Sequence, residues 1–244
     1  MDSDSLRAKI RLYVDHPLGA GQAIALSQPQ AHYLGNVLRK GPGTPLALFN
    51  GRDGEWRTEL VEIGRRAAVA HCQTLAAPQP MPPDLWLVFA PIKKARTDFI
   101  VEKAAELGAA RILPVQTDFT NSERIRQDRL QAHAVEAAEQ CGGTYVPEVT
   151  ALQPLGQLLD TWPEGRALIF ADETLAAEAR AVPLPAAPAA ILIGPEGGFS
   201  ERERQRLRAM GNVHSLALGP RILRADTAAV AALTLWQAQQ GDWT

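Results

Sequence analysis

The chain has 244 residues, which is enough for one large domain or two modest ones. Hydrophobic residues make up 46% and charged residues 21%, as in a globular protein with a buried core. The net charge is −2, so a nucleic-acid partner would have to bind local basic patches rather than a globally basic surface. No apolar run is long enough for a membrane span, and Cys72 and Cys141 suggest neither a disulfide framework nor a zinc site. We therefore expect a cytoplasmic protein with no metal and no membrane association.

The first 77 residues have the pattern of a small β domain. Apolar and polar residues alternate over residues 9–14, and further strands are predicted at residues 23–26, 45–49, 55–63 and 67–72. Residues 30–39 have helical spacing and end in cations followed by Gly41, which is a helix stop signal. These features predict a small β-barrel domain. Arg7, Lys9 and Arg11 share the polar face of the first strand, which is either an RNA contact or simply a solvated face.

A proline-rich segment divides the chain. Prolines occupy positions 78, 80, 82 and 83, and such a segment is a stiff linker. We therefore predict two domains, residues 1–77 and residues 78–244.

The second region has the pattern of an α/β domain. Continuous apolar strands are predicted at residues 85–90, 112–115 and 167–171, and helices at residues 97–107 and 124–140. Buried apolar strands that alternate with helices are typical of a parallel sheet covered on both faces. Lys93, Lys94 and Arg96 follow the first of these strands, where they form either a solvated loop or an anion contact.

The most informative stretch begins at residue 191. A short buried strand, residues 191–193, runs into Gly194-Pro195-Glu196-Gly197-Gly198, and residues 200–203 then form a helix-capping box. A plain turn between strand and helix needs only one glycine. Three glycines with a proline favour a ligand-binding loop, because a ligand can approach bare backbone closely. The loop has neither of the common nucleotide-binding glycine patterns.

A second glycine-proline loop lies near the end of the chain. A strand at residues 215–218 leads into the loop at residues 219–227, and a closing helix is predicted at residues 228–239. If this strand is parallel and adjacent to the strand at residues 191–193, the two loops form one pocket built from backbone. Asp172 and Glu173 end another predicted strand. They could accept hydrogen bonds from ligand hydroxyls, or Asp172 could cap a helix.

These motifs resemble those of the RsmE family, the 16S rRNA uridine-N3 methyltransferases of the SPOUT class. The resemblance is carried by residues 193–200 and 218–228, and is supported by residues 32–39, 49–51, 102–108 and 139–142. It implies a PUA-like RNA-binding domain at residues 1–77. It also implies a SPOUT methyltransferase domain at residues 78–244 with a trefoil knot, S-adenosyl-L-methionine as cofactor, 16S rRNA of the small subunit as substrate, and a homodimer. Two departures are Gly143, where the family usually has Arg, and Asp226, where it usually has Glu.

The resemblance also implies site residues. Arg224 is the expected catalytic residue, because the developing uracil anion needs a positive group. No general base is identified, although Glu196 and Asp226 are the nearest carboxylates by sequence. The expected cofactor-binding residues are Ala171, Ile193, Gly194, Pro195, Gly197, Gly198, Leu218, Gly219, Ile222, Leu223 and Thr227. The expected RNA-binding residues are Arg7, Lys9, Arg11, Arg39, Lys93, Lys94 and Arg96. The alternatives are a non-catalytic RNA-binding module and a methyltransferase of the same class that acts on a different RNA.

Overall fold

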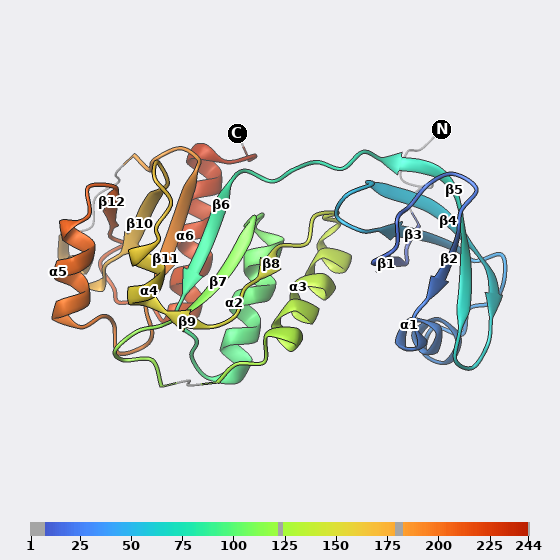
Figure 1. Cartoon of the computed structure of the whole chain (residues 1–244), viewed down its shortest axis with the longest axis horizontal. Helices are drawn as coiled ribbons and strands as arrows, with labels where there is room; N and C mark the ends of the chain where they lie inside the picture. The colour runs from blue at the N-terminus through green and yellow to red at the C-terminus, as the bar shows by residue number, and fades with distance from the viewer. Residues whose placement is uncertain (1–7, 122–123, 179–182, 244) are drawn as a thin grey trace. The chain divides into compact units, whose positions relative to one another are not determined.

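The computed structural model describes residues 8–121, 124–178 and 183–243 (Figure 1). These residues form two compact units. As far as they are described, the first comprises Met1–Met81 and Ala138–Val146, and the second comprises Pro82–Ala137 and Pro147–Thr244. The predicted boundary after residue 77 lies within four residues of this division. The prediction of an uninterrupted second domain missed the segment Ala138–Val146, which belongs to the first unit.

The first unit contains a five-stranded sheet with the strand order β1-β3-β4-β5-β2. Strands β1 and β3 pair in parallel, and the other pairs are antiparallel. Its helical part is α1 (Gln28–His32) followed by a π-helical turn (Tyr33–Val37), where a single helix was expected. The strands are β1 (Arg11–Tyr13), β2 (Ala23–Leu26), β3 (Pro45–Phe49), β4 (Glu55–Ile63) and β5 (Ala68–Ala77).

Arg11 ties the segment Ala138–Val146 into the first unit. Its side chain is 14% exposed and forms an ion pair of 2.7 Å with Glu55. The same guanidinium donates to the carbonyl oxygens of Ala138, Glu139 and Gly143 at 2.8–2.9 Å. These carbonyls lie in and just after the last turn of a helix, where acceptors lack partners within the helix. Arg11 therefore supplies donors to three carbonyl acceptors at this helix end.

The second unit is built on a parallel sheet with the strand order β12-β10-β11-β6-β7-β8, and β9 pairs with β7 beyond this path. The buried strands are near-continuous apolar runs, as expected for strands covered on both faces. The strands are β6 (Leu85–Phe89), β7 (Arg111–Gln116), β8 (Glu148–Val149), β9 (Gln153–Pro154), β10 (Ala167–Ala171), β11 (Ala189–Ile193) and β12 (Val213–Leu216).

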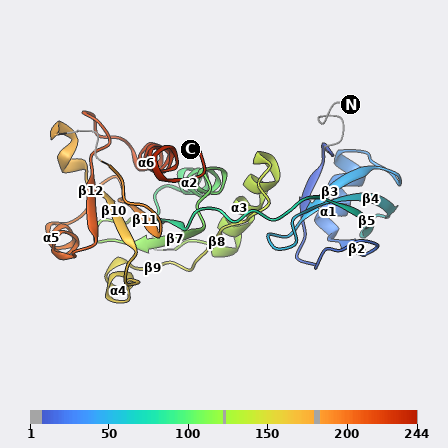
Figure 2. The ribbon, with the colours of Figure 1, turned by 90° about the horizontal axis from the view of Figure 1, so that it is seen from above.

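Helices cover both faces of this sheet (Figure 2). Helices α2 and α6 pack together on one face, and α4 and α5 contribute Leu158 and Leu207 to the apolar core on the other face. A 3-10 helix (Glu173–Glu178) follows β10. The α-helices are α2 (Lys94–Glu106), α3 (Gln127–Cys141), α4 (Leu155–Asp160), α5 (Glu201–Ala209) and α6 (Ala225–Gln240). None of the helices in the described ranges has the length and apolar character needed to cross a membrane.

The strand order corrects one expectation about the glycine-proline loops. They follow β11 and β12, which are not adjacent, because β10 lies between them and pairs in parallel with both. The carboxyl end of β10 therefore lies between the two loops. The two loops are therefore separated by a third strand end, that of β10.

Candidate functional site

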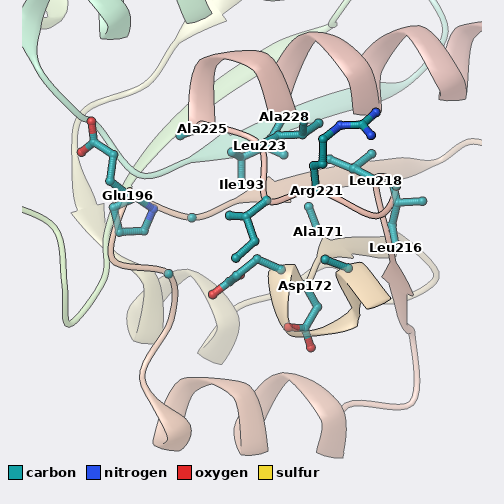
Figure 3. Close-up of a pocket in the computed structure, with 17 residues that line it drawn as sticks. Ala171, Asp172, Ile193, Glu196, Leu216, Leu218, Arg221, Leu223, Ala225 and Ala228 are labelled. Atoms are coloured by element: carbon teal, nitrogen blue, oxygen red, sulfur yellow. The ribbon is translucent and has the colours of Figure 1, made fainter. Parts of the chain in front are cut away.

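A cavity opens at the carboxyl ends of β10, β11 and β12 (Figure 3). Its walls come from the three segments that follow these strands and from the start of α6. The lining residues are Ala171, Asp172, Glu173, Ala176, Ile193, Gly194, Pro195, Glu196, Gly198, Leu216, Leu218, Gly219, Arg221, Ile222, Leu223, Ala225 and Ala228.

Most of the expected cofactor-binding residues line this cavity. Only Gly197 and Thr227 among them are absent from its wall. Arg224, the expected catalytic residue, is exposed at the position that precedes the first residue of α6, and it is not part of the lining. Arg221, three residues earlier in the same loop, does line the cavity.

Each of the three glycines of the first loop has a neighbour within the protein that leaves little room for a side chain. A side chain at Gly194 would meet the ring of Phe199 at 2.6 Å, and one at Gly197 would meet Cβ of Phe119 at 3.2 Å. Gly198 has a φ of +68°, and a Cβ there would overlap the Glu173 carboxylate. The space beside each glycine is therefore filled by the protein itself, and the loop is fixed by its own neighbours.

The expected capping box is confirmed at the start of α5. The amide of Glu203 donates to the hydroxyl of Ser200, and the carboxylate of Glu203 accepts from the amide of Ser200 at 2.9 Å. The Ser200 hydroxyl also donates to Asp118, which follows β7. These contacts fix the point at which the glycine loop enters the helix.

Asp172 is the centre of a buried ionic network below the cavity. Its side chain has no exposed surface and accepts from Arg204 at 2.6 Å and from Arg208 at 2.8 Å. It also caps the following turn by accepting from the amide and the hydroxyl of Thr174 at 3.1 and 2.6 Å. Figure 3 shows its carboxylate directed toward α5. Burial raises the pKa of Asp172, but the hydrogen bonds from Thr174 and Arg208 and the charge of Arg204 outweigh it, so its pKa is lowered.

Arg204 connects two neighbouring segments at the cavity, one after β10 and the other after β11. Its Nε donates to the carbonyl of Phe199 in the glycine loop at 3.1 Å. Its two terminal nitrogens donate to Asp172 and Glu173 after β10. The Arg204 side chain is 10% exposed, so these charge-assisted bonds lie largely out of water.

The expected RNA-binding residues have different surroundings. In the first unit Lys9 and Arg39 are exposed, whereas Arg11 is occupied by the contacts described above. Arg7 lies outside the described residues. In the second unit Lys93 and Lys94 are exposed at the start of α2, and Arg96 forms an ion pair of 2.6 Å with Asp226.

Several lining residues were not among the expected site residues. The sequence pattern indicates Asp172 and Glu173 only as possible hydroxyl acceptors, and it gives no signal for Arg221. Their position follows from the strand order, because the segment after β10 lies between the two glycine-proline loops. As for metals, the described part of the chain contains no group of three His, Cys, Asp or Glu side chains arranged to hold an ion.

Comparison with known proteins identifies two domains in the chain. Residues 79–237 match an RNA methyltransferase domain, and residues 26–71 match an RNA methyltransferase PUA domain. The ribosomal RNA small subunit methyltransferase E of Synechocystis sp. is 31% identical, over 86% of this chain and 71% of its own length. The protein of the same name from Rickettsia conorii is 28% identical, over 91% and 93%.

Solved structures agree along nearly the whole chain. The ribosomal RNA small subunit methyltransferase E of Neisseria gonorrhoeae, bound to S-adenosyl methionine, has a TM-score of 0.88 at 29% identity and covers 96% of this chain and 99% of its own. A methyltransferase structure from Legionella pneumophila with bound S-adenosyl methionine has a TM-score of 0.85 at 31% identity, over 96% and 98%. The chain therefore belongs to the RNA methyltransferase family of ribosomal RNA small subunit methyltransferase E.

Proposed function

We propose that this protein transfers a methyl group from S-adenosyl-L-methionine to N3 of a uridine in 16S rRNA of the small ribosomal subunit. The observation that carries the proposal is the cavity at the ends of β10, β11 and β12, in a chain whose structural neighbour from Neisseria gonorrhoeae binds this cofactor. Uridine N3 as the target comes from the motif resemblance.

The cavity has the chemistry that this cofactor needs. Ile193, Leu218 and Leu223 offer apolar surface for a purine ring, and the backbone around Gly194 and Gly219 lies at the wall. Carboxylates and one guanidinium supply polar contacts for the ribose and amino-acid groups. When bound, S-adenosylmethionine supplies an electrophilic methyl group on a positively charged sulfur.

The remaining task of the protein is to orient uridine and to handle the N3 proton. Holding N3 in line with the methyl group is orientation catalysis. Arg224 is the proposed stabiliser of the uracil anion, since its side chain has no ion-pair partner among the described residues. Asp226 is occupied by Arg96, whereas Glu196 is exposed at the cavity rim and unpaired within the described ranges. Glu196 is therefore the carboxylate better placed to accept the proton.

The proposed RNA surface of the second unit begins at α2. Lys93 and Lys94 stand exposed at its amino end, where the helix dipole disfavours cations and favours a bound anion such as phosphate. These residues follow β6, which pairs with β11, so they lie at the same edge of the sheet as the cavity. Lys9 and Arg39 are the exposed candidates on the first unit.

Three further features belong to the proposal because the family resemblance implies them. They are a trefoil knot around the cofactor site, closure of the first unit into a PUA-like barrel, and a homodimer. A cytoplasmic location follows from a ribosomal substrate. The placement of β10 between β11 and β12 supports the knot, because the last strand pairs with β10 and not with β11, the strand that precedes it in the chain.

The deciding experiment is a methylation assay with labelled cofactor on purified 30S particles from cells that lack the enzyme, with tRNA in parallel. We expect one methyl group per particle, recovered as 3-methyluridine after digestion and mass spectrometry. Labelling of tRNA alone would support a methyltransferase of the same class with a different substrate. Cofactor binding without labelling of either RNA would contradict the proposed reaction, and absence of cofactor binding would favour a non-catalytic RNA-binding module.

A further inference from the structure

We propose that the Glu173 carboxylate accepts hydrogen bonds from the two ribose hydroxyls of the cofactor, and that Arg204 is the residue that positions it. The inference rests on the proposed function and deepens it, because it assigns one part of the cofactor to one side chain. Glu173 would then determine specificity for ribose over deoxyribose.

The two acidic residues after β10 differ in whether a carboxylate oxygen remains free to accept a hydrogen bond from a ligand. Asp172 is fully buried, and both of its oxygens are used by Arg204, Arg208 and Thr174. Glu173 is 32% exposed, lines the cavity, and uses Oε1 to accept from Arg204. No hydrogen bond to Oε2 of Glu173 is found among the described residues. Glu173 is therefore the acidic residue that can still bind a ligand.

Glu173 is also held in a defined place. Arg204 binds it from below while donating to the carbonyl of Phe199. Its carboxylate fills the space beside Gly198, where a Cβ would overlap it. The acceptor thus lies between the segment after β10 and the glycine loop after β11. A carboxylate at a strand end is a known acceptor for ribose hydroxyls in α/β sheets.

The local charge favours hydroxyl groups over an ammonium group as the donor. Asp172 and Glu173 carry two negative charges, and Arg204 and Arg208, which bind them, carry two positive charges. The network is neutral as a whole, so it has no net attraction for a cation. The amino-acid end of the cofactor carries an ammonium group, whereas the ribose offers two neutral donors on adjacent carbons.

Calorimetric titration with two product-like ligands separates these groups. S-Adenosylhomocysteine has both the ribose hydroxyls and the ammonium group, and 5′-methylthioadenosine has only the hydroxyls. We expect Glu173→Gln to weaken both ligands by the same factor, about tenfold, as for loss of a hydrogen bond to a charged group. The wild-type protein should bind the 2′,3′-dideoxy analogue of 5′-methylthioadenosine more weakly than 5′-methylthioadenosine itself, by a similar factor in affinity.

The positioning role of Arg204 has its own signature. Arg204→Gln should weaken 5′-methylthioadenosine but leave affinity for the dideoxy analogue unchanged, which a general loss of structure would not do. Glu164→Gln is the matched control, since Glu164 is exposed near the amino end of β10, away from the cavity. Glu173→Asp keeps the charge but shortens the side chain, and it replaces the Gln variant in this test if the Gln variant does not fold. It should weaken the binding of both ligands.

Each other outcome overturns the assignment in a recognisable way. Weaker binding of S-adenosylhomocysteine alone would place Glu173 at the ammonium group. Unchanged binding of both ligands to a folded variant, or full affinity of wild-type protein for the dideoxy analogue, would remove Glu173 from the site. Failure of wild-type protein to bind S-adenosylhomocysteine or S-adenosylmethionine would instead refute the proposed function, and the inference with it.

Discussion

Replacement of Gly198 by alanine should destabilise the protein more than the same change at Gly219. Both glycines have positive φ angles, +68° and +105°, so alanine is strained at either position by about 1–3 kcal/mol. At Gly219 nothing lies within 4 Å of the added Cβ. At Gly198 the Cβ overlaps the Glu173 carboxylate and approaches a terminal nitrogen of Arg204 at 3.1 Å.

The extra cost at Gly198 follows from the displaced ion pair. Moving Glu173 away from Arg204 removes a hydrogen bond between charged groups, which is typically worth about 1.5–3 kcal/mol. For a chain of this size about 2 kcal/mol corresponds to roughly 4–8 °C in Tm. We therefore expect Gly198→Ala to melt at a Tm lower than that of Gly219→Ala by an amount of this order.

A double-mutant cycle tests the cause directly. Glu173→Ala vacates the space beside Gly198, so Gly198→Ala should cost less in that background, and the two changes should not be additive. The measurement is the thermal unfolding of the four proteins by differential scanning calorimetry without ligand. Equal Tm values for the two glycine variants, or strict additivity in the cycle, would refute the account of why residue 198 is glycine.

Three further outcomes are expected. Arg224→Ala should lower kcat of methyl transfer at least a hundredfold with little change in cofactor affinity. Arg221→Ala should mainly weaken cofactor binding, because Arg221 lines the cavity. The reverse pattern in steady-state kinetics would exchange their roles. The lowered pKa of Asp172 contributes stability that is complete above the ordinary aspartate pKa of about 4 and is lost as the pH falls below it. Asp172→Asn should therefore flatten the fall of Tm on acidification. An unchanged dependence of Tm on pH would contradict this. If Lys93 and Lys94 each neutralise one single-strand phosphate, replacing both by Ala should reduce the salt dependence of RNA binding by about 1.4 log units of affinity per log unit of salt. Identical salt slopes for the variant and the wild-type protein in filter binding would exclude these two residues from the RNA surface.

The sequence predicts the elements of the second unit better than their arrangement. Strand β10 and the capping box at Ser200 are correct because a continuous apolar run and a Ser-x-x-Glu pattern are local signals. The order of parallel strands is not local. Nothing in the strand sequences says that β10 separates β11 from β12, so the sequence pattern does not place Glu173 at the cavity.

Arg204 shows a second limit of sequence reasoning. It lies in α5, a helix so rich in Arg and Glu that its pattern indicates a solvated surface, yet its side chain is 10% exposed. Its partners come from a segment 31 and 32 residues earlier, so no spacing rule links them. Arg11 is similar, since alternation placed it on a polar face and the structure uses it to bind carbonyls more than 120 residues away.

The contacts of Arg11 with Ala138, Glu139 and Gly143 mean that the amino-terminal unit is not one contiguous stretch of chain. A fragment that ends in the proline-rich linker would lack the segment Ala138–Val146. The Arg11 guanidinium would then keep its ion pair with Glu55 but lose its three carbonyl acceptors. This unit therefore cannot be exchanged between relatives as a cassette of residues 1–81. A functional chimera would have to include residues 138–146 together with residues 1–81.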